Sequence, residues 1–275
     1  MNRRRIVRNL VALGLFAALG SGLLPGLRAA EGASPSARDI MDKVALTRKL
    51  DGSEAVVKMI IVSEQGQTRE RKITMATKLF DGGKTEKRIY RFLSPADVQG
   101  TGVLVFDYET QADDVWIYLP ALRKTRRIVS SQKSQSFMGS EFTYGDLNIP
   151  PLDDFNYTLV KEEDYGGEGC FVIDVLPKKK ETGTEEGYSK KTYWVSKSKF
   201  AVRKGLFYDT GGALLKELKT EDIKLLDPKK NRYRAMKMEM TNKKNNRRSV
   251  FESEKVTLAP DTKDEFFTPR YLERP

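Results

Sequence analysis

The sequence predicts a mainly β protein built on one large curved antiparallel sheet or a barrel. Segments rich in β-branched and aromatic residues recur at intervals of about 10–15 residues along most of the chain. Glycine, asparagine, aspartate and proline cluster between these segments, in the combinations that turns and hairpins require. About a dozen strands connected in this way favour a single extended sheet or barrel.

A short helix is predicted before the strands. Asp39 can cap a segment whose apolar residues share one face, and Gly52 lies beyond its end. The apolar residues are Ile40, Met41, Val44 and Ala45. Strands are then predicted at 54–63, 68–80, 85–93, 102–108, 113–119 and 124–129. After an irregular stretch at 130–154, strands resume at 155–163, 170–176, 188–195, 201–208, 213–226, 233–240 and 247–256.

Several central strands are apolar on both faces. In residues 115–119 one face carries Val115 and Ile117, while the other carries Trp116 and Tyr118. An antiparallel sheet with one face in water should instead alternate apolar with polar residues. Both faces are therefore expected to be covered. Two arrangements fit equally well: a two-layer core with a helix on one side, and a barrel whose apolar interior is only partly filled.

A methionine stripe bears on the same choice. Met236, Met238 and Met240 project from one face of a predicted strand, with Lys237 and Glu239 on the other. Methionine is flexible and suits a surface that accepts variable apolar partners. The stripe is suggestive of a cavity, but a plain core stripe is the favoured interpretation.

Residues 1–30 are predicted to be an export signal peptide, which leaves a single domain at 31–275. Arginines crowd the first eight positions, residues 10–24 form an apolar run that ends at Pro25, and Ala29 and Ala30 offer a cleavage site. The run is shorter than the roughly 20 residues of a membrane-spanning helix. A twin-arginine signal and an uncleaved membrane anchor are the alternatives. The expected compartment is the periplasm.

Composition argues against most enzyme classes. The chain has no histidine, which removes imidazole-based triads and the commonest general base. Cys170 is the single cysteine, and it opens an apolar strand that favours a buried, inert thiol. Neighbouring carboxylates such as Asp113 and Asp114 point to opposite faces of a strand. We therefore expect no catalysis, no cofactor and no metal site. Because the protein is expected to be exported, we expect no nucleic-acid partner despite the net charge of +11.

Three segments together resemble the outer-membrane lipoprotein-sorting family of LolA-like and LolB-like proteins, and most closely its larger lipoprotein-sorting-like subgroup. They are residues 113–128, 137–147 and 266–274. The resemblance implies a half-open antiparallel β-barrel of about eleven strands, with helices lidding a concave apolar face that takes up acyl chains. It also implies an inner-membrane transporter of the RND or ABC type and an outer-membrane acceptor as partners. The cargo would be lipoprotein acyl chains, phospholipid or another envelope lipid.

The resemblance directs attention to three sets of residues. Trp116 and Tyr118 are expected to face the concave interior and bind lipid. Further candidates for that surface are Tyr90, Phe92, Phe106, Met59, Ile61, Met236 and Met238, for which ordinary packing is the alternative. Phe137, Met138, Phe142 and Tyr144, in the irregular stretch, are candidates for a lid or rim. Arg123, Arg126 and Arg127 are candidates for contact with a partner or lipid headgroups, against a merely solvated strand end.

These expectations favour a periplasmic carrier that shields acyl chains in transit toward the outer membrane. A lipid-sensing regulatory protein with a related half-barrel is one alternative. A hydrolase of envelope polymers that uses Asp or Glu is another.

Overall fold

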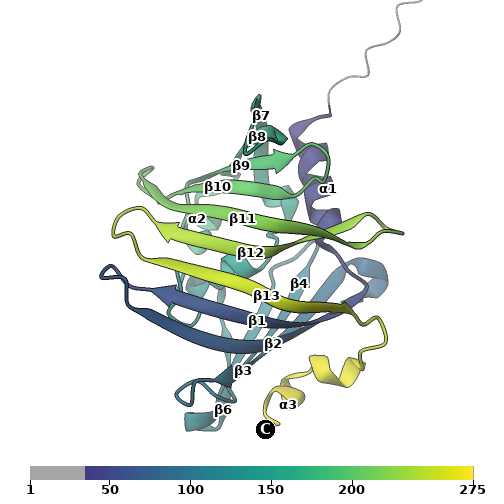
Figure 1. Ribbon diagram of the computed structural model, residues 1–275, viewed down its shortest axis with the longest axis vertical. Coiled ribbons are helices and arrows are strands. Elements are labelled where there is room, and N and C mark those ends of the chain that lie inside the picture. Colours follow the sequence, from purple (N-terminus) through teal and green to yellow (C-terminus); the bar gives the residue numbers. More distant parts are fainter. Residues whose placement is uncertain (1–34, 275) are drawn as a thin grey trace, which may run out of the picture. The chain divides into compact units, whose positions relative to one another are not determined.

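The strands of this protein form one antiparallel sheet that does not close on itself (Figure 1). The computed structural model describes residues 35–274. The predicted signal peptide at 1–30 lies outside the described residues. The strands are β1 (Gly52–Val62), β2 (Thr68–Phe80), β3 (Thr85–Ser94), β4 (Gly102–Tyr108), β5 (Asp114–Leu119), β6 (Lys124–Ile128), β7 (Phe155–Asp164), β8 (Gly169–Pro177), β9 (Lys190–Ser196), β10 (Val202–Tyr208), β11 (Leu214–Asp227), β12 (Arg232–Asn242) and β13 (Arg248–Leu258).

The prediction of a mainly β, unclosed fold is confirmed, with thirteen strands where the resemblance implied about eleven. The strand order is β6-β5-β4-β3-β2-β1-β13-β12-β11-β10-β9-β8-β7. Neighbours in this order are mostly successive hairpins, and only the β1–β13 pair joins the two ends of the chain. Strands β6 and β7 are therefore the two edges of the sheet, although they follow one another in sequence.

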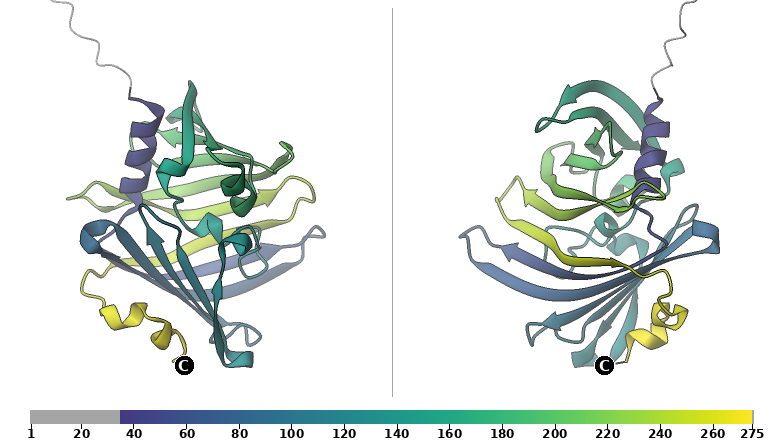
Figure 2. Two further views of the ribbon diagram at one scale, coloured as in Figure 1. Left: turned by 180° about the vertical axis from the view of Figure 1, so that it is seen from behind. Right: turned by 45° about the vertical axis from the view of Figure 1, so that its right-hand side comes forward.

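This order dictates where the connection between β6 and β7 must run. Residues 129–154 have to cross from one edge of the sheet to the other, and they cross on its concave side (Figure 2). They contain only three-residue 3₁₀ turns, η3 (Ser130–Gln132), η4 (Gly145–Leu147) and η5 (Leu152–Asp154). We call residues 130–147 the cover, because they lie over the inner face of the sheet.

Helix α1 (Ala37–Arg48) lies on the same concave side. Its N-cap is Ser36, and Asp39 completes a capping box with Ser36 rather than capping the helix alone, as the sequence suggested. The buried face of α1 packs on the inner face of β8 and β9, in a cluster that includes Ile40, Val44, Ile173 and Val195. The expected helical lid therefore exists over one half of the sheet, while the irregular cover serves the other half. A second helix, α2 (Lys180–Glu186), connects β8 to β9.

The C-terminal segment covers the outer face of β3, β4 and β5. It comprises η6 (Asp264–Phe267) and α3 (Pro269–Leu272), and its side chains Phe267 and Leu272 are fully buried there. Gly102 permits this approach, because a Cβ at that position would lie 2.6 Å from Leu272 Cδ1. Within residues 35–274, no helix has the length and apolar character that crossing a membrane requires.

Candidate functional site

The inner face of β1, β2, β3 and β4 is a continuous apolar surface. It arises because alternate residues of each strand point to the same side of the sheet. Met59 and Phe92 are completely buried on this surface, and Ile61 and Tyr90 are nearly so. They belong to one cluster with Ile73, Val103, Val105, Val115 and Ile117. An apolar surface of this extent is the kind of site that an acyl chain would bind.

The aromatic side chains of the cover fill the space above this surface. Phe137 is fully buried, with its ring centroid 6.0 Å from that of Tyr90 and 6.1 Å from that of Phe92. Tyr144 meets the same ring edge-on at 5.6 Å, and Phe142 packs at 4.8 Å on Phe251 of β13. The inner face is therefore occupied by the protein's own aromatic rings.

Polar contacts fasten the middle of the cover at Glu141. Lys216 Nζ donates to the backbone oxygen of Glu141 at 2.7 Å, and the amide of Glu141 donates to Ser249 Oγ at 2.9 Å. The carboxylate accepts from Asn242 Nδ2 at 3.0 Å and pairs with Arg247 Nε at 3.2 Å. Glu141, Lys216 and Ser249 are buried, so the bonds between them also satisfy groups that would otherwise be costly to enclose.

Arginine 88 fastens the end of the cover. Its guanidinium donates to the backbone oxygen of Leu147 at 2.7 Å, to Asn148 Oδ1 at 2.8 Å and to Asp107 Oδ2 at 2.5 Å. Arg88 is 3% exposed, and Asp107 is similarly enclosed. Burial raises the pKa of the Asp107 carboxyl, although the neighbouring Arg88 acts in the opposite direction.

A second buried carboxylate adjoins this anchor. Asp113 Oδ2 accepts a hydrogen bond from Asn148 Nδ2 at 2.7 Å, so it holds the same end of the cover. Burial, followed by repulsion from Asp107, raises the pKa of Asp113 to about 7. The attachment of the cover thus includes a carboxyl group that titrates near neutral pH.

The inner face becomes polar at the end of the sheet where α1 ends. The hydroxyls of Ser53 and Thr77 are buried there and lie 2.8 Å apart. Arg234 Nη1 donates to Ser53 Oγ at 3.3 Å, and Arg48 is the last residue of α1. The concave side therefore has an apolar region under the cover and a basic region beside it.

Comparison with known proteins identifies the family. A domain from Vibrio parahaemolyticus, provisionally assigned to outer-membrane lipoprotein sorting, is 30% identical, with a TM-score of 0.79 over 86% of this chain and 98% of that chain. This chain belongs to the same family as that lipoprotein-sorting domain. A family model described as an uncharacterised protein matches residues 84–274. A search of curated proteins finds no match.

Two further solved structures are similar to this chain. A DUF1329 family protein from Desulfovibrio piger is 28% identical and has a TM-score of 0.79, over 86% of this chain and 97% of that chain. A LolA superfamily protein from Nitrosomonas europaea is 21% identical, with a TM-score of 0.64 over 86% of this chain and all of that chain. The last comparison shows a shared fold.

The structure of this member of the lipoprotein-sorting domain family separates the predicted lipid-facing residues onto two faces. Met59, Ile61, Tyr90 and Phe92 lie on the inner face. Met236 and Met238 lie there as well, Met236 buried and Met238 half-buried against the main cluster. The expectation that Trp116 and Tyr118 face the concave interior is wrong. Together with Phe106 they pack on the outer face against the C-terminal segment, because Val115 and Ile117 take the inner positions of β5.

The other predicted residues lie on the cover and at an edge. Phe137, Phe142 and Tyr144 are buried on the underside of the cover, where a lid would place them, and they do not form the rim of an open cavity. Met138 is half-buried, and its backbone oxygen accepts a hydrogen bond from Arg71 of β2. Arg123 and Arg126 are exposed at edge strand β6, and Arg127 pairs with Asp114.

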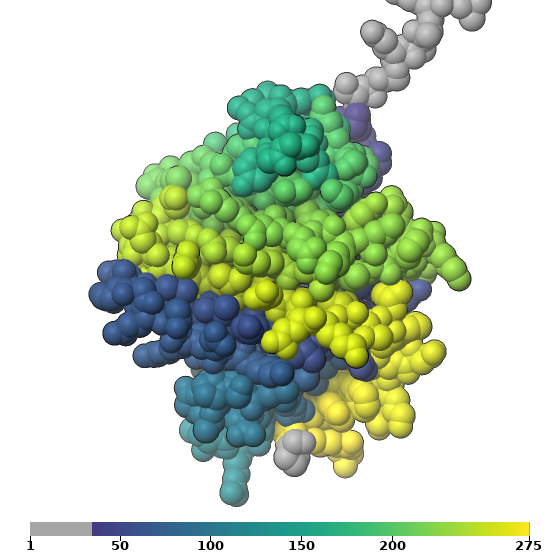
Figure 3. Space-filling model, in the orientation of Figure 1, coloured from purple at the N-terminus to yellow at the C-terminus, as the bar shows by residue number. Residues whose placement is uncertain are grey.

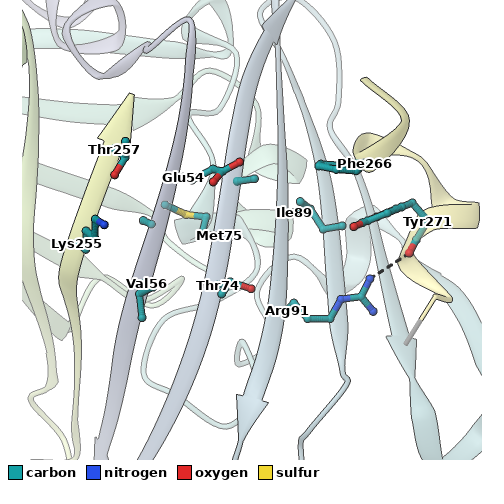
Figure 4. Close-up of a pocket in the computed structure, with 12 residues that line it drawn as sticks. Glu54, Val56, Thr74, Met75, Ile89, Arg91, Lys255, Thr257, Phe266 and Tyr271 are labelled. Atoms are coloured by element: carbon teal, nitrogen blue, oxygen red, sulfur yellow. Dashed lines mark hydrogen bonds between the residues drawn. The ribbon is translucent and has the colours of Figure 1, made fainter. Parts of the chain in front are cut away.

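A groove of about 420 Å³ lies on the outer face, between the C-terminal segment and strands β13, β1, β2 and β3 (Figure 4). Phe266 and Tyr271 stack at its wall with ring centroids 4.7 Å apart. Glu54 and Lys255 border it, and the guanidinium of Arg91 donates to the backbone oxygen of Tyr271 at 3.0 Å. The space-filling view shows the strands of this outer face as a continuous layer beside the C-terminal segment (Figure 3). Its mixed charges distinguish the groove from the apolar inner face.

Residues that the sequence did not single out hold the site together. The cover is anchored through Lys216, Glu141 and Arg88. Each is a charged residue, and charged residues are ordinarily expected at the surface. The alternation of side chains along a strand gave one signal. Arg88 stands two positions before Tyr90, so the two side chains share one face of the strand. A charged residue in register with a buried aromatic one indicates a buried polar contact.

Proposed function

We propose that this protein is a lipid carrier of the cell envelope that binds acyl chains against the inner face of β1–β4. The observation that carries the proposal is the insertion of Phe137 between Tyr90, Phe92 and Phe251. An apolar chain that displaced this ring would exchange one buried apolar contact for another. The exchange would therefore cost little hydrophobic free energy. Without the Phe137 ring, by contrast, the inner face would be exposed to water whenever no lipid is bound.

The build of the cover supports such an exchange. Its only regular elements are 3₁₀ turns, and the bonds that hold it in place involve the side chains of Lys216, Asn242 and Arg88. A segment held in this way can move as a unit without disturbing the ladder of the sheet. Binding sites are frequently closed by segments of this kind, positioned on a rigid scaffold.

The physical requirement for a carrier is large. Burying each methylene is worth about 0.8 kcal/mol, so a 14-carbon chain left in water costs roughly 11 kcal/mol. Unassisted passage of such a chain between two membranes would be negligible at that cost. A protein that shields the chain removes most of the barrier and needs no covalent chemistry to do so. The proposed cargo is a lipoprotein acyl chain or another envelope lipid.

Partners follow from the same proposal. A carrier must receive its lipid from an inner-membrane transporter and deliver it to an outer-membrane acceptor. Arg123 and Arg126 lie exposed at the β6 edge and offer a basic surface to an acidic partner or to anionic headgroups. The name of the Vibrio parahaemolyticus relative, which refers to outer-membrane lipoprotein sorting, agrees with this role.

Mass spectrometry of the protein purified from its own host tests the proposal. We expect an acyl lipid to co-purify, and a fluorescent fatty acid to bind and be displaced by that lipid. A photo-reactive residue at Met75, half-buried on the inner face, should cross-link to the lipid. The same residue at Lys72, exposed on the outer face of the same strand, should not. Absence of bound lipid together with no probe binding would overturn the proposal.

A further inference from the structure

Strands β12 and β13 are paired along only part of their length. The paired residues run from Lys237↔Glu252 to Thr241↔Arg248, although β12 begins at Arg232 and β13 continues to Leu258. Beyond Lys237 the two strands separate (Figure 1). In this region β12 remains hydrogen-bonded to β11, and β13 remains hydrogen-bonded to β1 as far as Ser53. The sheet therefore has a seam at this end.

Two arginines lie on the concave side of the seam. Arg234 projects from the inner face of β12, and its hydrogen bond to Ser53 Oγ spans the separation to β1. Arg48 ends helix α1, which packs against β12. Within residues 35–274, neither of these guanidiniums forms an ion pair, whereas the nearby Arg88 has Asp107 at 2.5 Å and Glu86 at 3.5 Å.

The positive charges at this end of the inner face repel one another. Desolvation by the surrounding protein atoms, and after it repulsion from Arg88, lowers the pKa of Arg48, although the end of this side chain is exposed to solvent. Burial also lowers the pKa of Arg234, and the nearby Arg48 contributes in the same direction while Glu86 opposes it. In the neighbouring Arg232 the Nε atom is buried without a hydrogen-bond partner. An anion bound by Arg48 and Arg234 would offset this repulsion between like charges.

Apolar residues connect this basic group to the cover. Met236 is buried on the same face of β12, and Met238 and Val256 are half-buried against the main apolar cluster. An amphiphile with its head at Arg234 would thus lay its chain along methionines toward the aromatic rings. A free inorganic anion would make no use of that surface.

We propose that Arg48 and Arg234 form a binding site for the phosphate of a lipid headgroup, which rests on the proposed carrier function and makes its substrate class an acidic phospholipid or another phosphorylated amphiphile. Guanidinium groups bind phosphate oxygens through paired, charge-assisted hydrogen bonds, and no other side chain matches this geometry as well. The seam between β12 and β13 places this site at the ends of these two strands. There the headgroup can reach water while the acyl chain lies against the inner face.

Two soluble lipids with the same acyl chains test the proposal: dioctanoyl phosphatidylglycerol and dioctanoylglycerol. Each is titrated against a bound fluorescent fatty acid, with the wild-type protein and with the R48Q/R234Q double variant. We expect the wild type to prefer the phosphatidylglycerol, and the double variant to lose about 10- to 100-fold of its affinity for it. Affinity for dioctanoylglycerol should be unchanged. The R48K/R234K variant should recover part of the preference.

A matched control carries the same change of net charge on the same two elements. Lys43 is exposed on α1, and Lys237 lies on β12 facing away from Arg234. The K43Q/K237Q variant should bind both lipids as the wild type does. Equal loss in this control, or an unchanged preference in R48Q/R234Q, would overturn the proposal. So would competition by inorganic phosphate at the concentration of the lipid, since it would indicate a site for the free anion.

Two outcomes separate this proposal from the carrier function itself. If neither lipid displaces the probe from the wild type, the carrier function fails. If both displace it equally, only the headgroup site fails. Thermal unfolding of each variant establishes that it is folded, and R48Q alone serves if the double variant is not, because the Arg48 side chain is exposed.

Discussion

The ring of Phe137 lies 6.1 Å from the ring of Phe92, measured between centroids, and both side chains are completely buried. One belongs to an irregular segment and the other to the centre of the sheet. The contact joins the cover to the surface that we propose for lipid binding, so it is the first place to test both stability and access.

Phe137→Ala should destabilise the protein and open the inner face. Truncating a buried phenylalanine typically costs about 3–5 kcal/mol, since it leaves a cavity. Chemical denaturation measures this loss, and a fluorescent fatty acid should bind the variant more tightly than the wild type. Leu122→Ala, at a position that is 63% exposed, is the control and should change neither quantity. Weaker probe binding by a folded Phe137→Ala protein would contradict the prediction.

Lys216→Met should release the middle of the cover. The substitution removes the donor to the Glu141 oxygen and leaves a buried acceptor unsatisfied, at a cost of about 1–3 kcal/mol. Hydrogen exchange of residues 137–147 should become faster, while exchange in β8 and β9 stays slow. Lys219→Met, on the exposed part of the same strand, should leave the exchange of the cover as it is. Uniformly faster exchange would instead indicate global destabilisation.

The stability of the protein should fall as pH rises from about 4 to 7. The pKa of Asp113 is raised from 3.8 to about 7 in the folded protein, so in this range the folded state binds more protons than the unfolded state. The contribution is complete below pH 4 and lost once the pH passes 7, with a slope of at most about 1.4 kcal/mol per pH unit. The chain has no histidine, so no imidazole titrates in the same pH range as Asp113.

Asp113→Asn isolates the contribution of that carboxyl group. Denaturation midpoints of the variant between pH 5 and 8 should be nearly flat, because asparagine does not ionise. Asp153→Asn is the control, since Asp153 is exposed and pairs with Arg38, which lowers its pKa. That control should keep the wild-type slope. A slope retained by Asp113→Asn would assign the effect to another group, of which Asp107 is the nearest.

Gly102→Ala should loosen the C-terminal segment. A Cβ at Gly102 would lie 2.6 Å from Leu272 Cδ1 and 3.1 Å from its Cγ, so the segment would have to shift. Trypsin should then cleave at Arg270 sooner, and acrylamide should quench Trp116 more strongly in a background with Trp194 replaced by Phe. Gly169→Ala on β8 places its Cβ in ordinary contact, 3.6 Å from Lys197 Cδ, and should change neither readout.

Much of this fold could be predicted from local sequence, because strand positions follow from β-branched runs and turn residues. The register of each face also follows locally, as the shared side of Met59 and Ile61 shows. Which of the two faces is concave does not. In β5 both faces are apolar, so alternation alone cannot decide between Ile117 and Trp116, and the choice depends on the distant residues Phe267 and Leu272.

The role of residues 130–154 was equally beyond local reasoning. Their composition predicts an irregular connection, and the aromatic residues suggested a lid. Their burial follows from topology, because β6 and β7 are opposite edges and the chain must cross between them. The hydrogen bond from Lys216 to Glu141 joins residues 75 positions apart, so no local sequence pattern predicts it.

An unclosed sheet also has to avoid association through its edges. The unpaired backbone groups of β6 and β7 are templates on which a further strand can assemble, in another copy or in an aggregate. Strand β6 carries Lys124, Arg126 and Arg127, and β7 carries Lys161, Glu162 and Glu163. Like charges would repel a second β6 laid alongside, so these residues oppose pairing between two β6 edges. A strand that does pair with β6 would have to bring carboxylates with it.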